Sequence, residues 1–427
     1  MNLEISSLSN GLTIITDPMA SLESAALGVW VGTGSRQESR PEMGISHMLE
    51  HMAFKGTATR SARAIAEEIE AVGGYLNAYT SREQTAFHAR VLKNDVPLAL
   101  DIIADILVNP AYDAAELERE RQVVLQELGQ ARDTPDDIVF DHLHAQVYQG
   151  QALGWPILGE ESSVTAFTPA MLRDYSARQY RADGLVLVSS GAVSHAAILK
   201  LAEEKFAGLS AGTPGAAPSA HYVGGELRAV EDLEQAHITY GFPGVSARDS
   251  DFYAAQLYAT ILGGGMSSRL FQEVREKRGL CYSVYAFVNN FQDTGFTGIY
   301  VGTGPDEAGQ VSAVIAGEMD GMTRDVSDAE LSRAKAQLKS GLLMGLERPG
   351  SRAEQIAGQI FTLGHVQSVS EIIARVDAVD AAAIKSYAAR TMAMPSIAAV
   401  GPIQKLETLE RFSTRFASST TFGQAAE

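Results

Sequence analysis

The chain has 427 residues, of which 45% are hydrophobic and 20% charged, and it carries a formal net charge of −18. This length exceeds the size at which one hydrophobic core usually stops growing, so we expect two domains of roughly 200 residues each. The negative charge argues against nucleic acid or an anionic membrane as a partner, because either would be repelled over much of the surface.

Cysteine content and the N-terminal residues bear on the compartment. The single cysteine, Cys281, excludes an internal disulfide and favours a reducing compartment. The opening residues MNLEISSLSNGLTIITDP have neither a basic stretch before an apolar run nor an Arg-rich amphipathic pattern. No segment approaches the roughly 18 apolar residues of a membrane span. We therefore expect a cytoplasmic protein with no membrane partner.

The first half of the chain alternates between strand-like and helix-like patterns. Strands are predicted in GLTIITDP (11–18), AALGVWVGTGS (25–35) and YLNAYTSREQTAFHARVL (75–92). Helices are predicted at 44–54, at 61–72, near 95–107 and over Glu116–Asp137.

A linker and a second, similar half follow. Gly, Ala, Pro and Ser accumulate at 211–225, which predicts a linker at 213–225 between domains at 1–212 and 226–427. The second half repeats the element order, which indicates an internal duplication. Its predicted elements are strands at 237–244 and within 281–303, and helices near 251–262, 267–277 and 306–322. We predict an α+β fold of two homologous repeats, each an antiparallel-rich sheet covered by helices.

The sequence HMLEH, residues 47–51, has the spacing of a metal site. His47 and His51 are four residues apart, so on a helix their rings lie on one face, with the Cβ atoms about 6 Å apart. Imidazole suits zinc, but a catalytic zinc site has three protein ligands, so one is missing. Glu50 borders the same face, where a carboxylate can take a proton from bound water as a general base. The alternative is a helix with two half-buried, structurally satisfied histidines.

The two halves differ at this motif. The second half has AAQLYATILGGG where the first has ISHMLEHMAFKG, so only one copy carries the polar cluster. A purely structural feature would be expected in both copies. The asymmetry therefore favours a functional role for the motif.

The third ligand should come from another helix, and two glutamates are candidates. Glu120 and Glu127 are seven residues apart in the next strong helix, hence on one face and two turns from each other. Solvated charge is the ordinary explanation for such residues. However, Val123, Val124 and Leu128 make much of this helix apolar, so a carboxylate among them invites a partner.

With HMLEH and the glutamate of VVLQEL, the chain resembles the HxxEH zinc metallopeptidases (inverzincins) of the pitrilysin family. Within that family the likeness is strongest to the β subunits of mitochondrial processing peptidase and their bacterial relatives, and it covers both halves. The resemblance implies one zinc ion (Zn2+) per chain, with His47, His51 and Glu127 as ligands and Glu50 as the base. Glu120 matches a glutamate that supports the site without binding the ion.

The resemblance also implies how a peptide substrate is bound. GGYLNAYTSREQTAF is similar to the family's edge strand, along which an extended peptide pairs, and it places Asn77 and Ala78 at the positions facing the peptide. The alternative is a hairpin with a polar edge. In the second half, VREKRGLCYSVYAF matches Arg275 and Tyr282 to a pair that binds substrate carbonyls and steadies the tetrahedral intermediate. Without the resemblance, Arg275 would be one charge in the solvated run REKR.

Two substrate pockets follow from the same resemblance. Phe54 matches an aromatic residue that lines the pocket just after the scissile bond, although a core phenylalanine is the competing interpretation. Asp137 and Asp141 match acidic positions that face a substrate arginine in processing peptidases. Asp137 is one methylene shorter than the glutamate usual there. Together with the acidity of the chain, these positions predict a preference for basic, extended peptides.

The function that the resemblance implies is a zinc endopeptidase acting on unfolded or presequence-like peptides inside a chamber enclosed by paired repeats. A homodimer is the simplest expectation, because one chain holds both the zinc motif and the Arg/Tyr pair. A heterodimer with a degenerate homologue is the alternative. The competing class is a non-catalytic core-type scaffold subunit, against which the intact HxxEH and Glu127 argue. A metal-dependent hydrolase of small molecules is a third class that the sequence leaves open.

Overall fold

The computed structural model describes residues 3–416 and divides into two compact units. Unit 1 comprises residues up to 130, 155–218 and 343–367, and unit 2 comprises 131–154, 219–342 and 368 onward. Unit 1 therefore includes residues 343–367, which follow the linker expected at 213–225, and unit 2 includes residues 131–154, which precede it.

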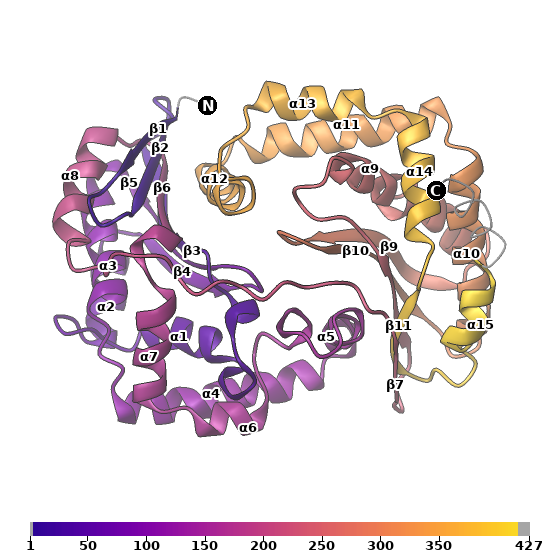
Figure 1. Cartoon of the computed structure of the whole chain (residues 1–427), viewed down its shortest axis with the longest axis horizontal. Helices are drawn as coiled ribbons and strands as arrows, with labels where there is room; N and C mark the ends of the chain where they lie inside the picture. The colour runs from indigo at the N-terminus through magenta and orange to yellow at the C-terminus, as the bar shows by residue number, and fades with distance from the viewer. Residues whose placement is uncertain (1–2, 417–427) are drawn as a thin grey trace. The chain divides into compact units, whose positions relative to one another are not determined.

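Unit 1 is built on a six-stranded sheet with the order β1-β2-β6-β3-β5-β4 (Figure 1). Strands β2 and β6 are parallel, and the other neighbouring pairs are antiparallel. The predicted strands at 11–18, 25–35 and 75–92 are confirmed. The strands are β1 Glu4–Ser7, β2 Thr13–Pro18, β3 Ser24–Val31, β4 Tyr75–Thr80, β5 Thr85–Leu92 and β6 Leu185–Gly191.

Helices cover both faces of this sheet. Successive side chains of a strand point to opposite faces, and both faces of β3 carry apolar side chains that must be buried. On β3, Leu27 and Val29 belong to one apolar core, while Trp30 belongs to another that includes residues of α12. The helices of the unit are α1 Ile45–Ala53, α2 Ala62–Ala71, α3 Val96–Val108, α4 Ala114–Arg132, α6 Glu161–Ala166, α7 Pro169–Gln179, α8 His195–Lys205 and α12 Pro349–Leu363.

Unit 2 repeats the plan with a five-stranded sheet in the order β7-β11-β8-β10-β9. Its strands are β7 Glu226–Val230, β8 Ala236–Pro243, β9 Cys281–Asn290, β10 Gly295–Thr303 and β11 Ser396–Gly401. Its helices are α5 Pro135–Val147, α9 Phe252–Gly263, α10 Ala308–Arg324, α11 Asp328–Gly345, α13 Val369–Ala378, α14 Ala381–Thr391 and α15 Leu409–Thr414, with a π-helix at Phe271–Glu276. The predicted fold class, two helix-covered and largely antiparallel sheets, is confirmed.

The duplication extends to an exchange of helices. In unit 2, α5 packs on β8 and β11, and in unit 1, α12 packs on β3 and β6, which hold the corresponding places in the other sheet. Apolar side chains make both contacts: Val139 and Leu143 of α5, and Ala353 and Ile356 of α12. A buried ion pair between Arg352 and Asp17 also fixes α12 to β2.

Two predicted helices differ from the observed ones. The helix expected over Glu116–Asp137 ends at Arg132, and α5 begins at Pro135. The reason is Pro135, because a proline disfavours the helical conformation of the residue before it and is favoured in the first turn of a new helix. The helix expected at 267–277 is largely a π-helix, in which the Lys277 N–H donates to the Gln272 carbonyl at 2.9 Å.

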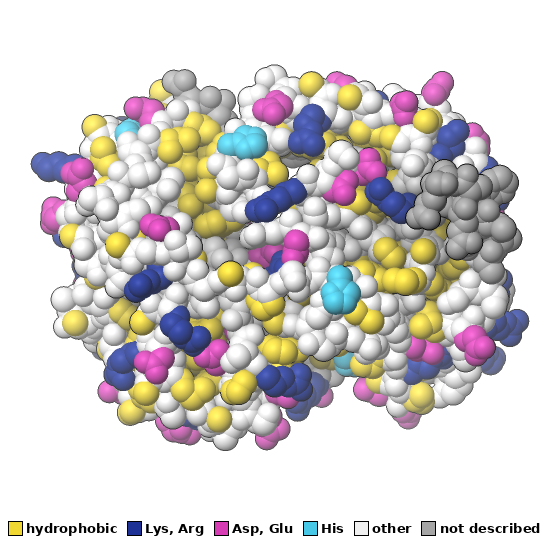
Figure 2. Space-filling model, in the orientation of Figure 1, with side chains coloured by type: hydrophobic (Ala, Val, Ile, Leu, Met, Phe, Trp, Pro, Cys, Tyr) yellow, Lys and Arg dark blue, Asp and Glu magenta, His cyan; other side chains and the backbone are white. Residues whose placement is uncertain are grey.

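The surface has no single charged region on the face shown in Figure 2, where acidic and basic side chains are interspersed. Within residues 3–416, no helix combines the length and the apolar character needed to cross a membrane.

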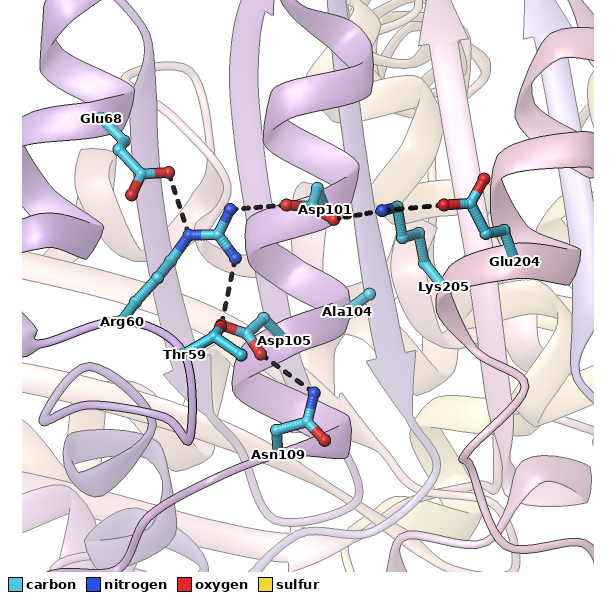
Figure 3. A pocket seen from close by; sticks show the side chains of 9 residues that line it. All are labelled: Thr59, Arg60, Glu68, Asp101, Ala104, Asp105, Asn109, Glu204 and Lys205. Atoms are coloured by element: carbon cyan, nitrogen blue, oxygen red, sulfur yellow. Dashed lines mark hydrogen bonds and ion pairs between the residues drawn. The ribbon is translucent and has the colours of Figure 1, made fainter.

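A cavity of about 470 Å³ in unit 1 is lined mainly by a network of ion pairs rather than by apolar side chains (Figure 3). The Arg60 guanidinium lies between Glu68 (2.9 Å), Asp101 (2.5 Å) and Asp105 (3.0 Å), and Lys205 contacts Asp101 at 2.8 Å. The network fastens the loop after α1 to α3 and to the end of α8. We interpret it as a structural tether.

Replacing Arg60 by Ala should lower the midpoint of thermal unfolding by about 5–10 °C. The change leaves the buried Asp105 without its cation and Asp101 with Lys205 alone, which costs on the order of 2–3 kcal/mol. The matched control is Arg63→Ala, because Arg63 is 85% exposed and has one ion pair, and its midpoint should move by less than about 2 °C.

The loss of thermal stability in Arg60→Ala should depend on pH. Burial alone would raise the pKa of Asp101, but hydrogen bonds from Lys205 and Arg60 outweigh it and lower that pKa; the pKa of Asp105 is also lowered. The network therefore stabilises the fold above the unfolded-state pKa of about 4 and loses this contribution as the pH falls further. Differential scanning calorimetry at pH 7 and pH 3 should show a smaller difference between wild type and Arg60→Ala at pH 3. An equal difference would mean that packing, not charge, is responsible.

Candidate metal centre

The helix α1 carries the HMLEH motif and is fixed by its buried face. Met48, Leu49 and Met52 are buried in the core of unit 1, which leaves His47, Glu50 and His51 on the partly exposed side.

The start of α1 depends on a glycine and a distant carboxylate. Gly44 has φ +88°, and a Cβ atom there would lie 2.7 Å from the Leu158 carbonyl oxygen, so only glycine fits. Because glycine has no capping side chain, Glu38 accepts the Gly44 and Ser46 N–H groups at 2.7 and 2.8 Å. Burial raises the pKa of Glu38 to about 8, although these hydrogen bonds act in the opposite direction. Sequence reasoning missed Glu38.

His47, His51 and Glu127 come together at one point. The Oε2 atom of Glu127, on α4, lies 3.7 Å from His47 Nε2 and 3.4 Å from His51 Nε2. The three ligand atoms all lie within 4.8 Å of one another. Among residues 3–416, this is the only group of three or more His, Cys, Asp or Glu side chains close enough to hold an ion.

The donor set fits a zinc ion. Ligand atoms about 2.0–2.1 Å from a tetrahedral zinc lie about 3.3 Å apart, close to the observed separations. Burial, and then the neighbouring His51, lower the pKa of His47 to about 4, so its ring is neutral near pH 7 and offers a lone pair. Metal ligation requires neutral imidazoles, so a ligand set of two histidines and one carboxylate carries a net negative charge, which a divalent cation would compensate. The 37% exposure of the Glu127 side chain leaves the group accessible.

Glu120 contacts His51 on the side of its ring away from Glu127. Its Oε2 atom accepts a hydrogen bond from His51 Nδ1 at 3.0 Å, so the His51 Nε2 lone pair faces Glu127. Its Oε1 atom pairs with Lys55 at 2.6 Å. Glu120 is buried, and the Lys55 ammonium balances its charge. Sequence reasoning missed Lys55, which lies two residues beyond the end of α1.

Glu50 lies beside the cluster but is not one of its three members. The Thr80 hydroxyl donates to Glu50 Oε2 at 2.7 Å. Burial raises the pKa of Glu50, partly offset by hydrogen bonds from Thr80. A raised pKa brings a carboxylate closer to the range in which it both accepts and returns protons near neutral pH. Sequence reasoning also missed Thr80. Its position two residues after Ala78, on the same predicted strand, was the only indication of a role.

The strand β4 is an edge strand of its sheet, as expected. Asn77 is exposed and Ala78 is buried. The Ala78 N–H donates to the Asn77 side-chain oxygen at 2.9 Å, and the Asn77 amide donates to the Tyr75 hydroxyl at 2.6 Å. Phe54 ends α1 and packs, half-buried, against the core of unit 1, so its contacts also fit the competing core interpretation.

The remaining predicted residues lie in unit 2. Arg275, in the π-helix, lies over the rings of Phe271 and Tyr282 at 4.7 and 5.2 Å. Tyr282 is on the edge strand β9 and is 76% exposed. Asp137 and Asp141 are one turn apart on α5. The helix α9 holds the position in unit 2 that α1 holds in unit 1, and it carries no histidine or carboxylate.

Two family models match the chain. The model of insulinase (peptidase family M16) matches residues 13–161, and the model of the peptidase M16 inactive domain matches residues 166–338. The second description agrees with the absence of ligands from α9.

Relatives match over most of the chain. A protein named as an uncharacterised zinc protease from Rickettsia felis is 40% identical over 89% of this chain and 93% of its own length. A probable mitochondrial-processing peptidase β subunit from Arabidopsis thaliana is 38% identical over 96% of this chain and 80% of its own.

A solved structure agrees in fold. The crystal structure of a protease from Helicobacter pylori superposes with a TM-score of 0.88 over 94% of this chain and 99% of the other, at 20% identity. The resemblance inferred from the motifs is thus confirmed by the family models and by relatives named as zinc proteases and as a processing peptidase. The chain belongs to the insulinase family of peptidases, family M16.

Proposed function

We propose that the chain is a zinc endopeptidase that hydrolyses extended, unfolded peptides, with a preference for basic ones, and that it binds one zinc ion. The observation that carries this proposal is the convergence of His47, His51 and Glu127 with a separate carboxylate, Glu50, beside them. Metal ligands without a general base would suit a structural metal site. A general base without metal ligands would lack the metal ion that activates the water. The two together suit hydrolysis.

The chain's residues divide the chemistry between them. A zinc ion held by the two histidines and Glu127 supplies a Lewis acid that lowers the pKa of water. Glu50 takes a proton from the attacking water and returns it to the leaving amine. Glu120 keeps His51 in the required tautomer and orientation. The edge strand β4 holds the peptide main chain by adding it as a further strand, so sequence selectivity must come from side-chain pockets.

We also propose that Arg275 and Tyr282 bind the peptide substrate. Both can donate hydrogen bonds to the oxygen on which negative charge develops. The stacking of Arg275 on Phe271 and Tyr282 supports this role, because it restricts a long side chain in advance. We propose that two copies of the chain pair to enclose the peptide, with a degenerate homologue as the alternative partner. Static light scattering on the purified chain tests this, and a monomer that is fully active would contradict it.

Glu50→Gln should reduce turnover of a fluorogenic basic peptide by about 10²–10⁴-fold while zinc content stays near one per chain, because the amide cannot accept the proton. Glu127→Gln should lose both activity and zinc. The matched control is Glu67→Gln on the exposed side of α2, which should retain both. Peptide cleavage and elemental analysis measure the two quantities. Wild-type turnover in Glu50→Gln would remove this carboxylate from the mechanism.

Glu120→Gln should weaken zinc binding by about 10–100-fold, because an outer-shell partner of a histidine ligand is lost or turned. Competition with a fluorescent zinc chelator measures the affinity. Glu118→Gln, on the exposed side of the same helix, serves as the control. Unchanged zinc affinity in Glu120→Gln would limit Glu120 to a packing role.

Asp137→Asn combined with Asp141→Asn should lower kcat/KM for peptides with arginine shortly before the cleavage site by about tenfold or more, with little change for peptides carrying norleucine there. Asp133→Asn, at an exposed residue just before α5, controls for the loss of one negative charge near this helix. A peptide library shows the preference directly, and the absence of Arg or Lys enrichment in the wild type would contradict the proposed selectivity.

A further inference from the structure

We propose that Thr80 is a positioning residue that holds the Glu50 carboxylate in place from the strand β4. This inference rests on the proposed function, in which Glu50 is the base and β4 receives the peptide. It adds a residue that the HxxEH motif does not contain. The hydroxyl of Thr80, rather than its methyl group, is the part that acts.

The contact is short and specific. Thr80 Oγ1 lies 2.7 Å from Glu50 Oε2 and 3.5 Å from the Ser46 carbonyl oxygen, so its single hydrogen goes to the carboxylate. Ser46 and Glu50 are one turn apart on α1, so Thr80 stands where β4 meets this helix. Hydrogen bonds of this length to an ionised carboxylate are charge-assisted and directional.

Within residues 3–416, no lysine, arginine or histidine forms an ion pair with Glu50. A glutamate side chain has several rotatable bonds and would otherwise sample many positions on a partly exposed helix face. The Thr80 hydroxyl holds Oε2, and the Thr80 backbone also donates a hydrogen bond to this carboxylate. Fixing one oxygen restricts the side chain without neutralising it.

The end of β4 is itself held firmly. Tyr79 and Thr80 are successive residues, so their side chains point to opposite faces of the sheet. The Tyr79 hydroxyl donates to Glu354 on α12, and the Trp30 ring N–H donates to the same carboxylate at 3.3 Å. Thr80 therefore reaches Glu50 from a strand anchored on its other face, and the same strand carries Asn77 and Ala78. The strand β4 thus holds the proposed base and also forms the proposed peptide-binding edge.

A purely structural role for Thr80 predicts a different pattern of variants. Valine keeps the shape of threonine and removes the hydroxyl, whereas serine keeps the hydroxyl and removes the methyl group. If Thr80 only packs β4 against α1, Thr80→Val should be tolerated and Thr80→Ser should not. If it positions Glu50, the order should be reversed.

The experiment compares kcat, KM and zinc content of the full-length wild type, Thr80→Val, Thr80→Ser and Thr85→Val with a fluorogenic basic peptide. Thr85 pairs with Thr80 across the hairpin and is buried, but its hydroxyl donates to the Thr33 carbonyl at 2.9 Å. We expect Thr80→Val to lower kcat by about 10–100-fold with KM and zinc unchanged, as a misplaced catalytic group does. Thr80→Ser and Thr85→Val should stay within about threefold of wild type.

Wild-type kcat in Thr80→Val, or equal losses in Thr80→Val and Thr80→Ser, would overturn the inference. A wild type that binds zinc and cleaves no peptide would instead contradict the proposed function. In that event crystal structures of the two variants decide the present inference. Glu50 should keep its position in Thr80→Ser and turn away in Thr80→Val, and an unmoved Glu50 in Thr80→Val would refute it.

Discussion

The position of α1 is the constraint on which the candidate site depends, because one nine-residue helix carries two of the candidate metal ligands and the proposed base. Its apolar face is locked into the core of unit 1, and its first turn is fixed by Gly44 and the buried Glu38. Any rotation of the helix would move His47, Glu50 and His51 together. The surrounding residues therefore act mainly on orientation: Glu120 acts on His51, and Thr80 acts on Glu50.

The two repeats separate fold from chemistry. α9 packs against β9 much as α1 packs against β4, yet its residues FYAAQLYATILG provide no ligand. The sheet order and the helix placement are retained, so the architecture does not require the metal site. What unit 2 offers is the Arg275 and Tyr282 pair on a π-helix and an edge strand, and π-helical turns are often found at functional sites.

Much of this could be predicted from the sequence where the signal is local. Alternation identified β2, β3 and the β4–β5 hairpin, and helical spacing identified α1 and the two histidines that converge with Glu127. Pro135 was a local signal for the end of α4 that the predicted helix overran. Thr80, Lys55 and Glu38 could not be assigned, because their roles exist only once a strand, a helix end and a loop come together. The helical pattern of α12 likewise reveals an apolar face but not which sheet that face covers.

The packing of α5 and α12 on sheets of the opposite halves limits how the chain can be divided. If the polypeptide were cut at the linker, the N-terminal piece would lack α12, and the Trp30, Val186 and Val188 side chains beneath it would meet water. The C-terminal piece would lack α5, which exposes Tyr300, Ala398 and Val400 in the same way. Each half of the chain therefore supplies the cover of the other half's sheet, so neither repeat can bury its own sheet face alone, although only one of them carries the candidate metal ligands.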